Sequence, residues 1–372
     1  MTGGERDRDA VTPYFPVLSH FPLIPSQFMD LDFNYEDVVL DLHDIALLLN
    51  YERATIEPRF RHAKLREVAA GGADFQTIRL SARAWTEALV PKTGLVFDMP
   101  KESGLSKAEK DEPDLPSNML PSVVVPSSPL RSLTNKDLEL YYWQSRNQDG
   151  CYTTVAIFQH FMEFFPLELT RIRVRVVENN KPRNYTTLAD DRTIVEVMLY
   201  EPRSMNFSAV VHNKSPILYT TGESTSMRHA VLSFPPPTLD HKRECILDLS
   251  SLQFGDAGRG FKGRGTFVLE PVQDYLARLD TIAVRNNFQD AERTQRVRPS
   301  ANDEFFVDVA KRAKARWEKR KTDPWCGHCG APSRDTPLKR CAKCRVAHYC
   351  NAEHQLAAWP YHKHFCPDPK TA

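Results

Sequence analysis

Two stretches carry apolar residues every three or four positions, the spacing of a helix with one buried face. The first predicts a helix within residues 34–65, interrupted by Pro58, with apolar positions Val38, Leu42, Ile45, Leu48 and Leu49. The second predicts a helix from Cys151 that stops before Pro166, with apolar positions Val155, Phe158, Met162 and Phe165. Thr134, with Asp137 three residues on, indicates the N-cap of a further helix.

Short alternating or β-branched segments follow the second helix. They predict strands at residues 172–177, 194–200, 207–211, 230–234, 245–249 and 266–269. Helices are then predicted over residues 271–284 and 302–321, the latter capped by Asn302. A helix followed by mostly short strands is typical of an α+β domain with an antiparallel sheet. We therefore expect an α+β body with mixed helices and an antiparallel sheet.

Changes of composition divide the chain into six parts. We expect an irregular arm at residues 1–30 and an N-terminal helical part of the body at residues 31–100. A Pro- and Ser-rich linker or surface loop is predicted at residues 101–131, followed by the α+β body at residues 132–300. A basic helix at residues 301–322 then leads to a small cysteine-rich C-terminal finger at residues 323–369.

Charge separates the C-terminal fifth of the chain from the rest. Residues 305–372 hold 14 Lys and Arg against 6 Asp and Glu, whereas the remaining 304 residues hold 35 against 42. Seven basic residues lie within residues 311–321 and could bind nucleic acid or act as a nuclear import signal. A solvated helix face is the more common meaning of such a run, so nucleic-acid binding is not expected.

The same sequence argues against secretion and against a membrane. The N-terminal residues carry charges without a following apolar core, and apolar runs such as residues 45–49 fall far short of the roughly 20 residues that span a bilayer. Six of the eight cysteines lie between Cys326 and Cys366, mixed with histidines. In a reducing compartment such a cluster indicates metal ligands rather than disulfides, so we expect a cytoplasmic or nuclear protein.

The spacing of these cysteines and histidines is that of a zinc module. Two Cys-x2-Cys pairs are followed by four single candidates, and the eight are Cys326, Cys329, Cys341, Cys344, Cys350, His354, His362 and Cys366. Structural zinc takes four thiolate or imidazole ligands, so eight ligands predict two Zn²⁺ ions. A segment this short cannot fold on its own core, so metal binding would supply its folding free energy. Nearby His328, His348 and His364 are interpreted as surface or supporting residues.

The order of these ligands and the residues between them resemble the MYND-type zinc finger. The resemblance rests on Tyr349-Cys350, His354-Gln355, Trp359, His362-Lys363 and Cys366. The resemblance implies interleaved sites. One would use Cys326, Cys329, Cys350 and His354, and the other Cys341, Cys344, His362 and Cys366. The departure is His354, where the family usually has Cys.

The resemblance also implies a function for the finger. MYND fingers are protein-interaction modules that take short proline-containing peptides, and Gln355 and Trp359 would line that surface. Trp359 could equally pack the finger's C-terminal helix. Residues 235–239 (PPPTL) have the composition of such a peptide and could dock on the finger of the same or a neighbouring chain. The SET-domain methyltransferases that carry such fingers are set aside, because their methyl-donor motifs are missing from this sequence.

A second resemblance lies in the body, to the transglutaminase-like branch of papain-like folds. Asp149-Gly150-Cys151-Tyr152 opens a helix, His229 begins HAVLSF, and Asp248 lies in ECILDLSSLQFG. The resemblance implies a triad of Cys151, His229 and Asp248. A helix N-terminus lowers the pKa of a thiol, an imidazole takes its proton and a carboxylate orients the imidazole.

Several alternatives to this triad remain open. His212 or His241 could replace His229, Asp240 could replace Asp248, and Gln144 and Gln148 are both candidate oxyanion donors. Cys151 could also be a small buried apolar residue, as most single cysteines are. We therefore expect a zinc-dependent protein-interaction protein with an intracellular regulatory or scaffold role. The alternative is a cysteine hydrolase or acyl transferase whose finger recruits the substrate.

Overall fold

The computed structural model describes residues 39–70, 73–78, 83–126, 128–212, 215–238, 240–298, 300, 302–334 and 336–367. The irregular arm expected over residues 1–30 lies outside the described residues, as does Leu239 of the proline-rich segment. The α+β expectation is confirmed, because helices and mostly antiparallel strands alternate through the described chain.

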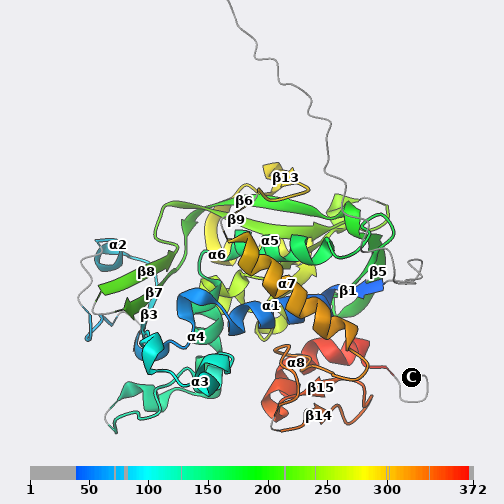
Figure 1. Ribbon diagram of the computed structural model, residues 1–372. Helices are drawn as coiled ribbons and strands as arrows, with labels where there is room; N and C mark the ends of the chain where they lie inside the picture. Colours follow the sequence, from blue (N-terminus) through cyan, green and yellow to red (C-terminus); the bar gives the residue numbers. More distant parts are fainter. Residues whose placement is uncertain are drawn as a thin grey trace, which may run out of the picture. The chain divides into compact units, whose positions relative to one another are not determined.

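The largest sheet is antiparallel and forms the top layer of the view in Figure 1. Its strand order is β11 (Val268–Pro271), β10 (Cys245–Asp248), β9 (Ser226–Phe234), β6 (Thr193–Pro202) and β12 (Ala283–Asn286), with β13 (Glu292–Thr294) also paired to β6. Because β9 and β10 are direct neighbours, residues that are 11 to 15 positions apart in the chain lie side by side on them, as Cys245 and Phe234 do.

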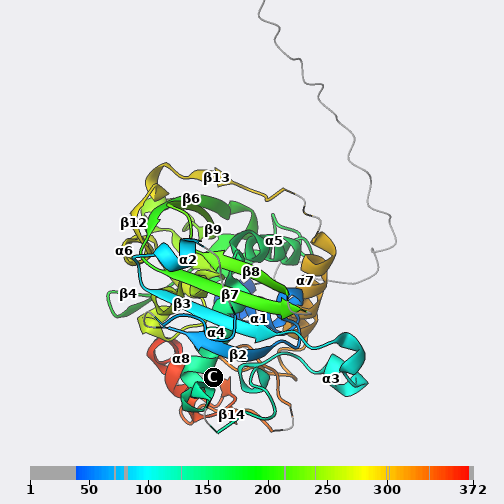
Figure 2. The same ribbon diagram turned by 90° about the vertical axis from the view of Figure 1, so that its left-hand side faces the viewer.

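A second sheet faces the viewer in Figure 2. It has the order β2 (Lys64–Ala69), β3 (Lys92–Asp98), β7 (Met205–His212) and β8 (Ser215–Thr221), and β3 pairs with β7 in parallel. A third sheet has the order β1 (Val39–Asp41), β4 (Arg171–Glu178) and β5 (Lys181–Leu188), with β1 parallel to β4. The body is thus not built from antiparallel pairs alone.

Residues 31–100 were expected to be helical, and this holds for only one part of them. They form one long helix, α1 (Leu42–Thr55), and the strands β1, β2 and β3. Strand β1 pairs with β4 and β3 with β7, each more than 100 positions later in the chain. The fold, and not the local pattern, decides these pairings.

The remaining predicted helices are present. They are α4 (Asn135–Asn147), α5 (Cys151–Met162), α6 (Val272–Ile282) and α7 (Asp303–Glu318), with short helices α2 (Arg83–Glu87) and α3 (Lys107–Asp111) and the finger helix α8 (Ala352–Phe365). Thr134 and Asp137 form the expected capping box at the start of α4. No helix in the described part of the chain is long and apolar enough to cross a bilayer.

The segment over residues 101–131 runs along the surface, as its composition predicts, but it is anchored at one buried carboxylate. Asp114 is 4% exposed, accepts a hydrogen bond from Nη1 of Arg61 at 3.1 Å and pairs with Nη2 of Arg146 at 3.6 Å. A buried carboxylate needs such partners to stay ionised, so the segment is held against α4.

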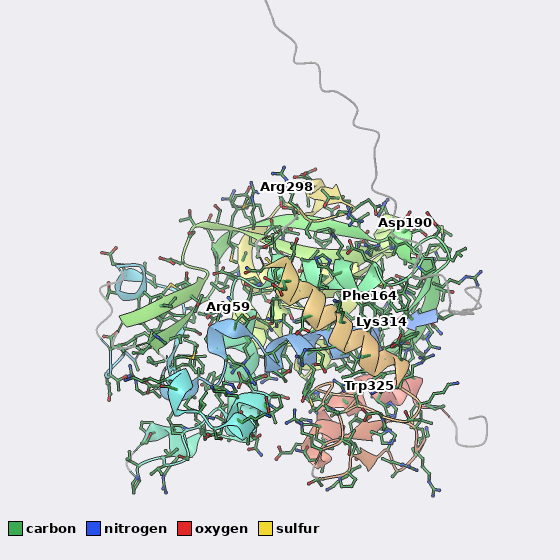
Figure 3. The ribbon with its side chains drawn as sticks, in the orientation of Figure 1. Arg59, Phe164, Asp190, Arg298, Lys314 and Trp325 are labelled. Atoms are coloured by element: carbon green, nitrogen blue, oxygen red, sulfur yellow. The ribbon has the colours of Figure 1, made fainter. Side chains whose placement is uncertain are left out.

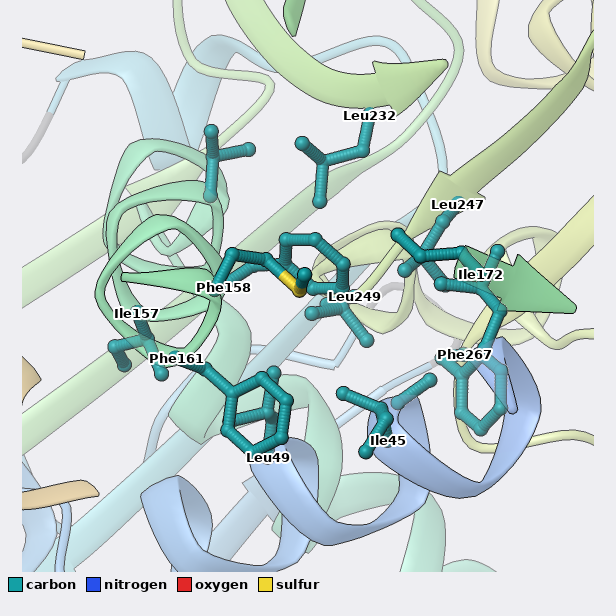
Figure 4. Close-up of a cluster of buried hydrophobic side chains, with 14 of the residues drawn as sticks. Ile45, Leu49, Ile157, Phe158, Phe161, Ile172, Leu232, Leu247, Leu249 and Phe267 are labelled. Atoms are coloured by element: carbon teal, nitrogen blue, oxygen red, sulfur yellow. The ribbon is translucent and has the colours of Figure 1, made fainter. Parts of the chain in front are cut away.

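The main core lies between α1, α5 and the strands of the first and third sheets (Figure 4). Ile45 and Leu49 of α1 meet Phe158 and Phe161 of α5, and Leu232 of β9 lies above them. Helix α7 covers the other side with Phe306, Val309, Ala310 and Ala313. The two helices predicted from apolar spacing therefore pack against each other as well as against the strands.

The outer face of α7 carries the basic run. Lys311 and Arg312 are exposed, and Nε of Arg312 pairs with Asp308 one turn earlier at 2.8 Å. The ammonium of Lys314 lies over the ring of Phe164, 5.9 Å from its centroid (Figure 3). Lys311 and Arg312 thus lie on a solvated helix face, as expected from the sequence, whereas Lys314 and Arg316 are half-buried.

The C-terminal finger packs directly against the body. Tyr51 of α1 is 5% exposed and belongs to the finger's own apolar cluster with Cys326, Cys341 and Tyr349. Arg316 of α7 links both parts: Nη1 pairs with Glu52 at 2.9 Å, and Nη2 donates to the Gly330 carbonyl at 2.6 Å. The body therefore completes the finger's core.

Gly330 should be essential for this docking. Its φ is +79°, and a Cβ there would lie 2.4 Å from the carbonyl oxygen of Leu47 on α1. Gly263, with φ +68° and nothing within 4 Å, is a matched control. Gly263→Ala should lower the free energy of unfolding by about 1–2 kcal/mol through backbone strain alone. Gly330→Ala should lower it by about 1–3 kcal/mol more, because α1 and the finger must separate. Denaturant unfolding of the zinc-loaded chain measures both, and equal losses would contradict the docking role.

Candidate functional site

The first metal centre is assembled from a knuckle, a short strand and the start of a helix. Cys326 and Cys329 lie on a turn closed by the Gly330 N–H, which donates to the Cys326 carbonyl at 2.9 Å. Cys350 follows β15 (His348–Tyr349), which pairs with β14 (Lys339–Arg340). His354 lies in the first turn of α8, and its N–H donates to the capping side chain of Asn351 at 2.8 Å.

The second centre uses the next knuckle and the last turn of the same helix. Cys341 and Cys344 lie on a turn in which the Cys341 N–H donates to the Ala347 carbonyl at 2.8 Å. His362 and Cys366 come from the end of α8 and the residue after it. Because α8 supplies ligands at both ends, it holds the two centres at a fixed spacing.

Both ligand sets have the dimensions of a zinc site. Within Cys326, Cys329, Cys350 and His354, and within Cys341, Cys344, His362 and Cys366, all ligand atoms lie within 4.8 Å of one another. The Sγ atoms of Cys329 and Cys350 are 3.7 Å apart. A regular tetrahedron with Zn–S bonds of about 2.3 Å has S···S edges of about 3.8 Å. The two quartets implied by the resemblance to MYND fingers are confirmed and fit two zinc ions.

Zinc in these centres would have a structural role. Each quartet already offers four protein ligands, so no coordination position is left for a substrate. The other histidines are not in either quartet: His348 is half-buried on β15, His364 is half-buried on α8, and His328 is buried. His328 instead contacts Glu139 of α4, with 2.8 Å between its Nε2 and Oε1 of the carboxylate.

The side chains expected to bind a peptide lie one turn apart on α8. Trp359 is 38% exposed and its ring lies 6.0 Å from that of His362, whereas Gln355 is half-buried. Trp359 thus does two things at once: it packs beside a metal ligand and it presents an aromatic surface to solvent. In the proline-rich segment Pro235, the residue after β9, is buried and Pro236 is half-buried, whereas Pro237 and Thr238 are exposed.

In the body, the structure brings Cys151, His229 and Asp248 together. Cys151 is the first residue of α5, His229 lies on β9 and Asp248 ends β10. Nε2 of His229 is 2.7 Å from Oδ2 of Asp248, and the Cys151 thiol lies near enough to the same imidazole to help raise its pKa. The exposed fractions are 5%, 0% and 1% in that order, so the cluster is almost fully buried.

The alternatives left open by the sequence lie elsewhere. His212 is exposed at the end of β7. His241 is half exposed and faces Glu244, with Nδ1 and Oε2 2.9 Å apart. Asp240 caps a short turn by accepting from the Lys242 N–H at 3.0 Å. Among these candidates the geometry selects His229 and Asp248.

Other buried polar side chains surround the cluster. The Gln253 amide nitrogen is 3.2 Å from Nδ1 of His229, and the Tyr275 hydroxyl donates to Oδ2 of Asp248 at 3.2 Å. Gln253 appears in the sequence motif, but nothing there assigns it a contact, and Tyr275 has no sequence signal. Gln144 and Gln148 are both buried, and neither side-chain amide nitrogen has a hydrogen-bond partner in the described part of the chain.

The charge of His229 is set by its neighbours. Burial by itself would lower the pKa of the imidazole, but the Asp248 carboxylate and the Cys151 thiol outweigh burial and raise the pKa of His229 to about 10. Burial and the same carboxylate raise the pKa of Tyr275 well above 10, so its hydroxyl remains a donor. The imidazole beside the Cys151 thiol is therefore charged below about pH 10.

Comparisons with known proteins agree with the metal centres. The family model described as MYND finger matches residues 326–366. This segment of the chain is therefore a MYND finger, a zinc-binding module, and fingers of this family generally mediate protein–protein interaction. No curated protein and no solved structure matched the chain.

The pKa of His229 gives a test of the buried pair. The pKa of His229 lies above the ordinary value of 6.5. The pair of His229 and Asp248 therefore stabilises the fold fully below about pH 6.5, and this stabilisation is lost as the pH rises through about 10. Asp248→Asn should bring the pKa of His229 well below 10, because burial then opposes the charge with less compensation. NMR titration of the ring protons measures it, with Asp240→Asn as a control that should leave it unchanged. An unaltered titration in Asp248→Asn would refute the pairing.

Proposed function

We propose that this protein is an intracellular regulatory or scaffold protein whose MYND finger binds a proline-containing peptide of a partner protein. One observation carries the proposal: Trp359 stands on α8, four residues from Gln355, and keeps 38% of its surface exposed within a metal-organised finger. Residues four apart share one helix face. An aromatic ring beside an amide is suited to proline-rich backbone, which packs on aromatic surfaces and offers free carbonyl acceptors.

Docking of the finger supports this role. The finger is held on the body by Tyr51, Gly330 and Arg316, and the Tyr361 hydroxyl of α8 donates to the Arg175 carbonyl of β4 at 2.9 Å. A rigidly held helix loses little conformational freedom on binding, which favours affinity. A captured partner would therefore be presented in one orientation relative to the body.

A peptide titration tests the proposal. The probe is a synthetic peptide containing PPPTL, and the protein is the full zinc-loaded chain in a calorimeter. Trp359→Ala should weaken binding about tenfold or more, as loss of an aromatic anchor does. Leu356→Ala is the control, because Leu356 is 64% exposed on the same helix and should change binding less than about twofold. Unchanged binding by Trp359→Ala, with two zinc ions still bound, would exclude Trp359 as the peptide surface.

The buried cluster favours a second candidate function, a cysteine hydrolase or acyl transferase with Cys151, His229 and Asp248 as its triad. The supporting observations are the 2.7 Å between Nε2 of His229 and Oδ2 of Asp248 and the influence of the Cys151 thiol on the pKa of that imidazole. Cys151 also stands at the N-terminus of the twelve-residue helix α5, where the helix dipole favours a thiolate. The resemblance to transglutaminase-like folds belongs to this candidate.

The chemistry would proceed as follows. The Cys151 thiolate attacks the acyl carbon, the bond to the leaving amine, alcohol or thiol breaks, and His229 gives the leaving group its proton. Water or an amine then attacks the acyl thioester, His229 takes its proton, and the thiolate returns. Asp248 holds the imidazole by accepting from Nε2. Gln144 and Gln148 remain candidates for the oxyanion donor, because each has a buried amide nitrogen without a partner among the described residues.

Burial limits which substrates could react. With 5% of Cys151 exposed, an acyl group must be slender or neighbouring side chains must move. Tyr152, the next residue, is 36% exposed and its hydroxyl donates to Glu196 at 2.6 Å.

Thiol reactivity separates the two functions. Alkylation by iodoacetamide, followed by mass spectrometry, should be faster at Cys151 than at Cys245, which is 0% exposed. His229→Ala should slow the alkylation of Cys151, because the imidazole that would take the proton from the thiol is removed. Equal alkylation rates in the unsubstituted chain and in His229→Ala would leave Cys151 as a packing residue.

A further inference from the structure

Glu139 connects the body to the first metal centre. It lies on α4, a helix of the body, and its side chain is 15% exposed. Oε1 of its carboxylate is 2.8 Å from Nε2 of His328, which lies between the two cysteines of the first knuckle. His328 itself is 4% exposed, whereas Glu139 and His354 also line a cavity of about 950 Å³.

The same carboxylate oxygen also faces the zinc ligand His354. Oε1 of Glu139 is 3.9 Å from Nε2 of His354, while Nδ1 of that ring lies 3.4 Å from Sγ of Cys326. The rings of His328 and His354 meet edge to face, with centroids 4.8 Å apart. The two nitrogens of His354 are therefore divided between the metal centre and the body.

An imidazole ligand needs such a partner. A metal-bound histidine generally donates its other N–H to a carboxylate, carbonyl or water, which fixes the orientation of the ring and makes it a stronger ligand. A thiolate has no second donor and would gain nothing from a carboxylate. The finger's departure from its family, His354 in place of Cys, therefore coincides with a carboxylate supplied from outside the finger.

We propose that Glu139, shared between His328 and His354, positions His354 as a zinc ligand, so that the first metal centre of the finger is completed by helix α4 of the body. Glu139 is a positioning residue and does not itself bind the metal. Zinc affinity at this centre and docking of the finger on α4 are then coupled, and each strengthens the other by the same factor.

Charge around Glu139 is consistent with this arrangement. A centre of three thiolates, one neutral imidazole and Zn²⁺ carries one net negative charge, which would repel a lone carboxylate. Arg259 is 4% exposed and places Nη1 3.7 Å from Oε2 of Glu139, on the oxygen that does not face the histidines. The guanidinium offsets the repulsion and leaves Oε1 to the two rings.

The second metal centre serves as a comparison within the same molecule. Nε2 of His362 is 3.5 Å from Sγ of Cys344, and within the described ranges no carboxylate is bonded to the His362 ring. Loss of Glu139 should therefore weaken one centre and spare the other. A general loosening of the finger would weaken both.

The experiment compares Glu139→Gln with Glu353→Gln in the full chain. Glu353 is exposed, adjoins His354 on α8 and accepts from Nδ2 of Asn135 at 3.2 Å, so its substitution removes the same charge nearby. Zinc is withdrawn with a chromophoric chelator, and the released thiols are alkylated and assigned by mass spectrometry. Glu139→Gln should weaken zinc binding at Cys326, Cys329 and Cys350 about 10- to 100-fold, and Glu353→Gln should not.

A variant without an imidazole at position 354 shows whether Glu139 acts by positioning His354 or by stabilising the fold. In His354→Cys the fourth ligand is a thiolate, so adding Glu139→Gln should leave the first centre unchanged or bind zinc more tightly, because a negative charge has been removed. If Glu139→Gln weakened zinc binding at the first centre equally with His354 and with Cys at that position, the proposal would be overturned. Glu139 would then stabilise the fold and not position the imidazole. An unaffected first centre in Glu139→Gln would also overturn it. So would three zinc ions per chain, which would make Glu139 and His328 ligands themselves.

Discussion

Helix α1 is the packing constraint on which both parts of the molecule depend. Twelve of its fourteen residues are buried, because it is covered by α5 and β4 on one side, by α7 on another and by the finger at Tyr51 and Leu47. A helix enclosed in this way cannot move without disturbing the body core and the finger core together. The finger is small and would have little apolar core without metal, so contact with α1 adds to what zinc provides. Body and finger therefore form a continuous packed structure.

Two segments reach both candidate sites. Helix α4 contacts the finger through Glu139 and carries Gln144, and the chain after it leads directly to Cys151. The segment after β10 places Gln253 beside His229 and, further on, lets Arg264 donate to the Leu356 carbonyl of α8 at 3.1 Å. A partner bound at the finger and a reaction at Cys151 would share these elements. Any coupling between them would pass through α4 and residues 253–264.

Burial gives the two sites different chemistry. The metal ligands lie in a finger with an exposed tryptophan, which suits binding, whereas His229 and Asp248 lie inside the sheet, where their charges attract strongly. That attraction keeps His229 charged in spite of its burial. An isolated imidazole in the same place would be neutral and a poor partner for a thiolate. The arrangement of β9 beside β10 is thus what gives the cluster its electrostatic character.

The sequence by itself determined the features that depend on short spacing. Cys-x2-Cys pairs and the positions of His354 and His362 gave eight ligands for two zinc ions, and the resemblance to MYND fingers implied how they divide into two quartets. Apolar periods gave α1 and α5, and β-branched runs gave six strands of the sheets. The hairpin from β4 to β5 was missed, although Asn179 and Asn180 have the positive φ values that such a turn requires. Only the tertiary structure selected His229 over His212 and His241, paired β3 with β7, and brought Glu139 to His328 across 189 residues. These contacts depend on which surfaces pack together, and no local pattern in the chain records that.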